Sequence, residues 1–342
     1  MPRIALLHDW LDRHFSCQPS TRNYALAPAS ADASFRRYFR VTLADQRTFV
    51  VMDAPPELED CRPFLKVAAL FGDAGVHVPE VHAENLEHGF LLLSDLGNTT
   101  YLSVLDESTA PDLYRHANAA LVDIQRASRP GVLPDYDHTL LTRELNLFPD
   151  WYVARHLGMV LDETQNATLR AVFEKILANN LAQAPVFVHR DYHSRNLMVS
   201  SDDYPASPGV IDFQDAVYGP ITYDLVSLYR DAYISWDEKQ ELDFVIRYWE
   251  MARQASLPVH EDFHDFYRDY EWMGAQRQIK VLGIFARLWY RDGKRGYLAD
   301  LPLTLKYVRN AAAGVTQLSA FSAWLERTIV PLLAAANARE LA

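Results

Sequence analysis

Two carboxylates and one amide lie within a pair of short apolar runs, VFVHRDYHSRNLMVS at 186–200 and GVIDFQD at 209–215. Asp191 follows the first strand in a loop that a hydroxyl can reach, where a carboxylate can accept a proton. Asn196 and Asp212 lie on the neighbouring strands of a predicted irregular hairpin, which brings them together, and Mg²⁺ prefers such oxygen ligands. These residue types predict proton transfer beside a bound metal.

The order of these residues matches a known reaction chemistry. His189-Arg190-Asp191 and Asn196 fit the pattern H-R-D-x-x-x-x-N of kinase catalytic loops, and Asp212 follows on the next strand. Phosphoryl transfer needs an acceptor hydroxyl held in line, a carboxylate for its proton, and cations over the triphosphate. We therefore expect a kinase that uses ATP and Mg²⁺, with Asp191 as catalytic base and Asn196 and Asp212 on the metal.

Composition bounds the partners of the chain. It has 342 residues, 49% of them hydrophobic, and its 33 basic and 45 acidic residues give a net charge of −12. This charge argues against nucleic acid or an anionic membrane as partner. The apolar runs are too short to span a bilayer, and residues 1–15 read as an amphipathic helix rather than a signal peptide. The sequence predicts a cytoplasmic protein with small-molecule ligands, no disulfide and no obligate protein partner.

The pattern of elements predicts an α+β fold of two parts. Residues 1–96 read as one helix followed by a β-rich lobe, with strands at 34–43, 48–54, 78–83 and 89–94 and a helix at 60–72. Residues 97–342 are mostly helical, and the hairpin that carries the candidate chemistry is planted among those helices. The predicted helices of this lobe lie at 107–127, 143–157, 164–182, 221–233, 237–254, 262–292 and 302–328.

At these residues the sequence resembles the aminoglycoside phosphotransferase and choline kinase-like family. The resemblance covers most of the chain and includes ASADASFRRYFRV, GFLLLSDLG and YGPITYDLVSLYRDAY. It implies a two-lobed, protein-kinase-like fold with a small β-rich N-lobe and a larger helical C-lobe. Within the family, the chain looks most like the bacterial kinases that phosphorylate N-acetylmuramate and N-acetylglucosamine at the anomeric hydroxyl in cell-wall sugar recycling.

The resemblance also implies roles for individual residues. The backbone near Ser94, Asp95 and Leu96 would hold the adenine edge of the nucleotide. Asp224 would brace the catalytic loop by accepting backbone N–H bonds, and His189 would likewise be structural. The phosphate-covering loop would include Ser34, Phe35 and Arg36. These assignments are expectations for the structure to place.

Two parts of the family pattern are missing. The phosphate-covering loop at 31–37 has no glycine, and Met52 or Asp53 stands where a phosphate-pairing lysine is expected. Arg36, Arg37 and Arg40 are possible substitutes because guanidinium groups bind phosphate well, and of these we favour Arg37. Two alternatives stay open: the arginines only cover an exposed hairpin, or the protein binds nucleotide without catalysis.

The acceptor side is less constrained by the sequence. His193, Gln214 and Asp215 lie near the predicted base and metal ligands and can hydrogen-bond a sugar, and Tyr229 offers an aromatic surface. The helix at 262–292 is apolar on most of its circumference, so its embedded Arg277 needs either an internal carboxylate or an anionic substrate. Arg277 is our candidate for the lactyl carboxylate of N-acetylmuramate. A cationic acceptor, such as an aminoglycoside or choline, is the alternative.

Overall fold

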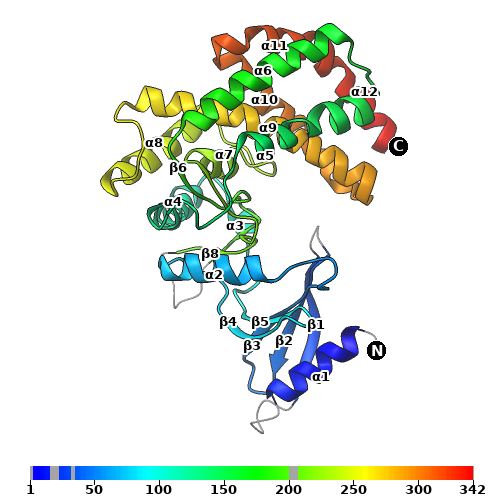
Figure 1. The fold of residues 1–342 in the computed structure, drawn as a ribbon, viewed down its shortest axis with the longest axis vertical. Coiled ribbons are helices and arrows are strands. Elements are labelled where there is room, and N and C mark those ends of the chain that lie inside the picture. Colours follow the sequence, from blue (N-terminus) through cyan, green and yellow to red (C-terminus); the bar gives the residue numbers. More distant parts are fainter. Residues whose placement is uncertain (1–2, 16–22, 32–34, 200–206, 342) are drawn as a thin grey trace. The chain divides into compact units, whose positions relative to one another are not determined.

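The computed structural model describes residues 3–15, 23–31, 35–199 and 207–341. The chain forms two compact units: Met1–Thr100 with Leu197–Asp215, and Tyr101–Asn196 with Ala216–Ala342. The first is built on a small antiparallel sheet and the second mainly on helices (Figure 1). The predicted α+β class is confirmed. The proposed boundary after residue 96 stays a prediction; contacts within the chain group the segment Leu197–Asp215 with the first unit.

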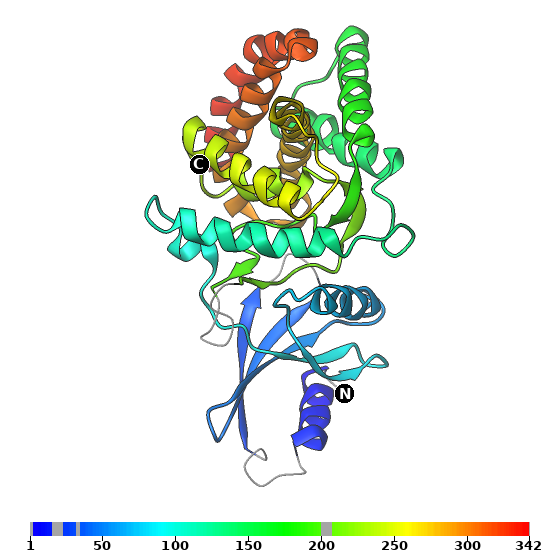
Figure 2. The same cartoon turned by 90° about the vertical axis from the view of Figure 1, so that its left-hand side faces the viewer.

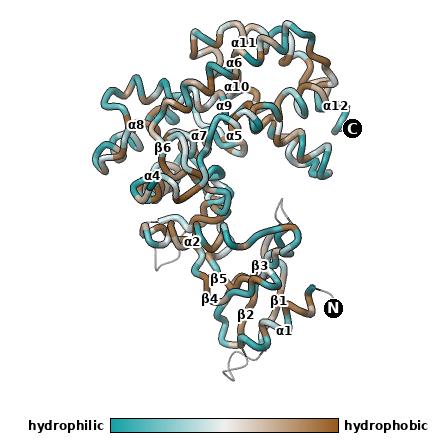
Figure 3. The backbone as a smooth tube through the Cα atoms, in the orientation of Figure 1, coloured by the Kyte–Doolittle hydropathy of each residue, from teal (hydrophilic) through white to brown (hydrophobic). Residues whose placement is uncertain are grey.

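The first unit contains a five-stranded antiparallel sheet in the order β1-β2-β3-β5-β4. Its register places Arg37 opposite Asp53 and Tyr38 opposite Met52. Hydrophobic residues run through the strands of this sheet (Figure 3). The strands are β1 (Tyr24–Ala31), β2 (Arg37–Leu43), β3 (Thr48–Asp53), β4 (Val81–Asn85) and β5 (Phe90–Ser94).

Strand β1 was not predicted from the sequence. It lies at the edge of the sheet, and its register against β2 shifts between Pro28 and Ser30. Proline has no backbone N–H to donate, so within sheets it is confined largely to edge strands and bulges. The run YALAPASA contains a proline and alternates only weakly, so its sequence does not indicate a strand. At the edge of the sheet, both the proline and the weak alternation are acceptable.

One face of the sheet is covered by helix α1 (Arg3–Phe15) (Figure 1). Leu7, Leu11 and Phe15 of this helix form one buried cluster with residues that include Val41 and Val51. Side chains alternate along a strand, so Asp53 shares the α1-facing side of β3 with Val51, and Met52 points to the other side. The charged side chains of these strands are therefore divided between the side that α1 covers and the opposite side.

The hairpin of β7 (Leu197–Met198) and β8 (Gly209–Val210) belongs to the first unit. Val210 N donates to His77 O at 2.8 Å, and the Phe213 ring packs on Phe64 and Phe71 with centroid distances of 4.9 and 5.9 Å. Phe64 and Phe71 are buried residues of helix α2 (Arg62–Asp73). These contacts fix the backbone on both sides of Asp212.

The second unit is organised around α9 (Phe263–Asp292), a 30-residue helix that packs against α5, α6, α7, α8 and α10 (Figures 1 and 2). Asp262 caps its N-terminus by accepting from His264 N, and Gly293 ends it at φ 70°. Two strands, β6 (Pro185–Val188) and β9 (Val217–Pro220), pair antiparallel. The other helices are α3 (Tyr101–Val104), α4 (Ala110–Arg126), α5 (His138–Leu145), α6 (Glu163–Ala182), α7 (Tyr223–Tyr229), α8 (Glu238–Gln254), α10 (Leu301–Gly314), α11 (Ser319–Trp324) and α12 (Val330–Leu341).

Two predicted helices are divided in the structure. The helix expected at 143–157 becomes α5 and a π-helical segment, Phe148–His156, with Pro149 at the start of that segment. The helix expected at 302–328 is interrupted after Gly314, and α11 begins at Ser319. None of the described helices has the length and apolar character needed to cross a membrane.

Candidate active site

A buried carboxylate accepts hydrogen bonds from the backbone of the segment that follows β6. Asp224, near the start of α7, accepts hydrogen bonds from His189 N at 2.7 Å and Arg190 N at 3.0 Å. His189 is fully buried, and its Nδ1 lies 3.2 Å from Asp191 N. Burial raises the pKa of Asp224 to about 7, and the two backbone N–H bonds and Arg277 act in the opposite direction. Both oxygens of Asp224 are thus used to position the loop that presents Asp191.

A second buried aspartate holds the other end of the same loop. Asp231, 1% exposed, accepts from Ser194 N at 3.0 Å, from Ser194 Oγ, and from Tyr233 N at 3.2 Å. Sequence reasoning missed Asp231, because it stands just after α7 with no motif of its own. Its distance in sequence from Ser194 left no local signal for the contact.

The backbone is strained at two points of the predicted chemistry. Arg190 has φ 77° and Asp212 has φ 64°, both in the left-handed region that residues other than glycine seldom adopt. Such conformations cost free energy and persist where surrounding contacts impose them. For Arg190 these contacts are its backbone bond to Asp224, its ion pair with Glu144 at 2.5 Å and the Tyr136 ring under its guanidinium.

Asp191 is half-buried, and its carboxylate accepts no hydrogen bond from any residue that the structure describes. Burial alone would raise its pKa. The positive charges of Lys280, His193, Arg190 and Arg277 outweigh that effect and hold the pKa below its usual value. At neutral pH Asp191 is therefore an ionised acceptor with no partner in the described chain.

A buried carboxylate from α5 pairs two of these cations. Glu144 lies 3.0 Å from Lys280 Nζ and 2.5 Å from Arg190 Nη2, and it also accepts from the Tyr136 hydroxyl. Lys280 further donates to Tyr223 OH at 2.8 Å. Burial works against ionisation of Glu144, but Lys280 and Arg190 outweigh it and lower its pKa. The sequence analysis did not identify Glu144 or Lys280 as part of this cluster.

The predicted substrate residues of the second unit have different surroundings. His193 presents an edge to the Tyr233 ring at 5.6 Å, and its buried Nδ1 has no hydrogen-bond partner among the described residues. Burial lowers the pKa of His193, and Asp231 and Asp191 act against that effect. Tyr229 is fully buried, and its hydroxyl donates to Asn118 Oδ1 at 2.5 Å. Tyr229 therefore belongs to the core of the helical unit rather than to a surface that a sugar can reach.

Arg277 is 5% exposed, on the same helix as Lys280. Within the described residues it donates no hydrogen bond and forms no ion pair, and its Nε is buried. The ring of Tyr223 lies 6.0 Å from its guanidinium carbon. The internal carboxylate that the sequence analysis offered as an alternative partner is not among these contacts.

In the first unit, Met52 and Asp53 stand where a lysine was expected, and they point to opposite sides of β3. Asp53 is fully buried on the α1-facing side, where Arg3 Nε donates to it at 2.9 Å and Arg37 Nε at 3.1 Å. Met52, 1% exposed, occupies the side of β3 away from α1. The favoured substitute Arg37 is thus bound to Asp53 on the α1 side, and its contact with phosphate stays a prediction.

The predicted adenine-edge residues lie at the end of β5. Ser94 N donates to Glu80 O at 2.9 Å, and Asp95 accepts from Arg40 Nε at 2.6 Å and Nη2 at 2.9 Å. Arg40 lowers the pKa of Asp95 against the effect of burial. Leu96 packs so closely over Gly209 that a Cβ there would lie 2.9 Å from Leu96 Cδ1. The bonds between Arg40 and Asp95 therefore join β2 to the residues that directly follow β5.

The remaining predicted residues of this unit are Ser34, Phe35, Gln214 and Asp215. Phe35 is 63% exposed, and its N donates to Glu59 Oε1 at 3.3 Å. Gln214 Nε2 donates to Asp212 Oδ1 at 2.8 Å, while Gln214 Oε1 has no partner among the described residues. Asp215 is exposed. Ser34 lies outside the described residues.

The donor set suits magnesium better than a transition metal. No three His, Cys, Asp or Glu side chains converge on one point in the described ranges. Magnesium commonly uses one or two protein carboxylates and takes its other oxygens from phosphates and water. Asp212, oriented by Gln214, fits that role. Asn196 Nδ2 donates to Asp191 O at 2.9 Å, so its amide oxygen is the end not used in that bond.

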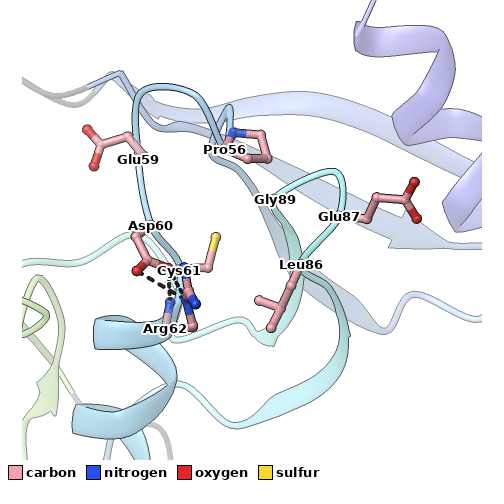
Figure 4. Close-up of a pocket in the computed structure, with 8 residues that line it drawn as sticks. All are labelled: Pro56, Glu59, Asp60, Cys61, Arg62, Leu86, Glu87 and Gly89. Carbon is pink, nitrogen blue, oxygen red and sulfur yellow. Dashed lines mark hydrogen bonds and ion pairs between the residues drawn. The ribbon is translucent and has the colours of Figure 1, made fainter.

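The first unit contains a cavity of about 340 Å³ whose lining residue Glu59 accepts from Phe35 N (Figure 4). Its walls are the 56–62 connection and the turn from Leu86 to Gly89. Figure 4 shows the ion pair of Asp60 with Arg62 beside Cys61, and Glu59 and Glu87 at the sides. It contains none of the predicted site residues, and its carboxylates make it a poor receptor for phosphate.

Comparison with known proteins agrees with this arrangement. A model of the phosphotransferase enzyme family (APH) matches residues 25–265. The chain is 49% identical over 320 residues to the N-acetylmuramate/N-acetylglucosamine kinase of Pseudomonas aeruginosa, covering 91% of this chain and 92% of that one. It is 47% identical to the protein of the same name from Neisseria meningitidis, covering 95% and 96%.

Solved structures share the fold at low sequence identity. A Plasmodium vivax ethanolamine kinase has a TM-score of 0.64 at 10% identity, over 89% of this chain and 88% of that one. The ADP-bound aminoglycoside phosphotransferase APH(2'')-Ib has a TM-score of 0.57 at 13% identity, over 89% and 97%. The two-lobed, kinase-like architecture is thereby confirmed.

Proposed function

Because this chain belongs to the phosphotransferase enzyme family, we propose that it transfers the γ-phosphoryl group of ATP to the anomeric hydroxyl of N-acetylmuramate and N-acetylglucosamine. The observation that carries the proposal is the 49% identity, over nine-tenths of both chains, to a kinase named for these two sugars. The proposed substrates are small molecules, and the reaction is placed in the cytoplasm, where ATP is available.

In the proposed mechanism, Asp191 accepts a hydrogen bond from the acceptor hydroxyl and takes its proton during transfer. Its carboxylate has no partner in the described chain, and two buried aspartates position its loop. The low pKa of Asp191 makes it a weak base. Weak basicity suits phosphoryl transfer, whose loose transition state calls for little proton removal before the phosphoryl group moves.

Asn196 and Asp212, which flank the β7–β8 hairpin in the chain, are the proposed magnesium ligands. Gln214 orients Asp212 by donating to Oδ1. When bound, magnesium neutralises charge on the phosphate oxygens of ATP. His193, with its buried Nδ1 unpartnered in the described chain, is the proposed hydrogen-bond partner of a sugar hydroxyl. Asp215 is a further candidate at the exposed end of the metal segment.

The nucleotide would bind with the adenine edge on the backbone of Ser94, Asp95 and Leu96. Met52 replaces the expected lysine, and we propose Arg36, in the covering loop, for the phosphate contact because guanidinium groups bind phosphate oxygens well. Arg37 is bound to Asp53, and Arg40 to Asp95. The predicted phosphate contact also includes Ser34 and Phe35. This assignment predicts that Arg36→Ala weakens ATP binding more than Arg37→Ala does.

The test is an acceptor panel with ATP and Mg²⁺, read as acceptor-dependent ADP release. We expect turnover with N-acetylmuramate and N-acetylglucosamine and none with choline or an aminoglycoside. Phosphorus NMR of the product, together with loss of its reducing-end reactivity, identifies the anomeric phosphate. Turnover restricted to a cationic acceptor would overturn the substrate, and nucleotide binding without turnover of any acceptor would overturn the enzyme itself.

A further inference from the structure

Helix α9 carries a buried cation that has no hydrogen-bond or ion-pair partner among the residues that the structure describes. Arg277 is 5% exposed, its Nε is buried without an acceptor, and it makes neither hydrogen bond nor ion pair with any described residue. An arginine cannot become neutral by releasing its proton in a protein. An unpaired charge in a buried site is destabilising, and no described carboxylate makes a direct ion pair with Arg277, so an anionic group of a ligand would be stabilised there.

Other buried cations of the same unit are paired. Lys280, three residues further along α9, lies 3.0 Å from Glu144 and donates to Tyr223 OH at 2.8 Å. Arg230 forms ion pairs with Glu241 at 2.7 Å and with Glu271. This fold thus provides internal carboxylates for Lys280 and Arg230, whereas Arg277 forms no ion pair with a described residue.

Arg277 is within electrostatic range of the predicted catalytic segment. Its charge acts on Asp191, His193 and Asp224, and the Tyr223 ring is 6.0 Å from its guanidinium carbon. Asp224 is not available to it, because both oxygens already accept backbone N–H bonds. An anion at Arg277 would therefore be part of the same molecule that presents its hydroxyl to Asp191.

The two proposed acceptors differ in this respect. N-acetylmuramate is N-acetylglucosamine with an added lactyl ether, and the lactyl group ends in a carboxylate. We infer that Arg277 binds this carboxylate and sets the preference of the enzyme between the two sugars, an inference that rests on the proposed function. A guanidinium fork matches the two oxygens of a carboxylate, which adds geometric selectivity to the charge attraction.

The experiment combines variants of Arg277 with acceptors that carry or lack the lactyl carboxylate. Binding and kcat/KM are measured for N-acetylmuramate, its methyl ester and N-acetylglucosamine, with the unaltered protein, Arg277→Ala and Arg277→Lys. We expect Arg277→Ala to weaken N-acetylmuramate by about 10- to 100-fold, the usual range for a lost hydrogen bond to a charged group. The ester and N-acetylglucosamine should change by no more than about twofold, and Arg277→Lys should fall between, since it keeps the charge but loses the fork.

Arg287 offers a matched control on the same helix. Its Nε is also buried without a partner among the described residues, and it lies ten residues further along α9, about 15 Å away. Burial lowers the pKa of Arg287, and the charged groups with the largest effects on it are Arg291, Asp292, Arg143 and Glu144. Arg287→Ala should leave the ratio of the two sugars unchanged.

The outcomes separate this inference from the proposed function. Equal loss on both sugars, or no loss on N-acetylmuramate, would overturn the carboxylate site while leaving the kinase intact. Failure of the unaltered protein to turn over either sugar would overturn the function, and this inference with it. The melting temperature provides a further readout: Arg277→Ala should not lower it, because the variant removes a buried unpaired charge, and a large decrease would instead mark Arg277 as structural.

Discussion

Asp53 of the first unit and Asp191 of the second are both surrounded by positive charge, but the two carboxylates use it differently. Asp53 is fully buried and accepts hydrogen bonds from both Arg3 and Arg37, which tie α1 and β2 to β3. Asp191 lies among Lys280, Arg190 and Arg277 without a hydrogen bond to any of them within the described chain. A carboxylate with its partners in place holds the fold together, whereas one kept ionised and unpartnered remains available to a ligand.

Asp224 stands between these extremes. It is buried like Asp53 but accepts two backbone N–H bonds and makes no ion pair in the described residues. The three aspartates therefore differ in their contacts: Asp53 joins elements, Asp224 positions a loop, and Asp191, the proposed base, has no hydrogen-bond partner in the described chain. Each set of contacts predicts a different response to the same substitution, aspartate to asparagine.

The largest effect is expected at Asp191. Asp191→Asn removes the proton acceptor but no hydrogen bond within the described chain, so kcat should fall about 10²- to 10⁴-fold with both sugars. The melting temperature should stay the same or rise. Kinetics and thermal unfolding of the same preparation check this. Retained kcat would show that Asp191 is not the base, and a large loss of stability would remove the contrast with Asp53.

The reverse pattern is expected at Asp53. Asp53→Asn leaves Arg3 and Arg37 facing a neutral amide, which should lower the free energy of unfolding by about 2 kcal/mol, because the charge-assisted bonds of a buried carboxylate are weakened. Urea unfolding measures the change, and kcat of the folded fraction should be retained. Asp45→Asn, in the exposed pair with Arg47, is the matched control and should have no measurable effect. Equal stabilities for the two variants would contradict the structural role of Asp53.

The smallest effect is the pH dependence at Asp224. Its pKa is raised to about 7 in the folded state by burial, so folding takes up a proton at this site between about pH 4 and pH 7. The folded state then binds more protons than the unfolded state, and the contribution of Asp224 to stability falls as pH rises through that window. Asp224→Asn removes the titration, so the stability of the unaltered protein relative to the variant should decrease from pH 5 to pH 8. An increase over this range would contradict the direction of the pKa shift.

Much of the fold was predictable because its signals are local. The two strand-like runs at 34–43 and 48–54, joined by a polar turn, predicted the β2–β3 hairpin, and the apolar pattern of 262–292 predicted α9. Strand β1 escaped because Pro28 is acceptable only at an edge, and edge position is a property of the assembled sheet. The surroundings of Arg37 were also not predictable from the sequence. Its side chain lies on the side of the sheet that α1 covers, and this position depends on how α1 packs.

The sequence by itself determined the chemistry: Asp191, Asn196 and Asp212 stand in the order and spacing of a kinase, and the chain belongs to that family. Only the tertiary structure decided which charges are already paired. Arg3 and Asp53 are 50 residues apart, Arg190 and Glu144 46, and Ser194 and Asp231 37. Pairing across such separations depends on packing rather than on local pattern, so the sequence could not show that Arg277 forms no ion pair with a described residue.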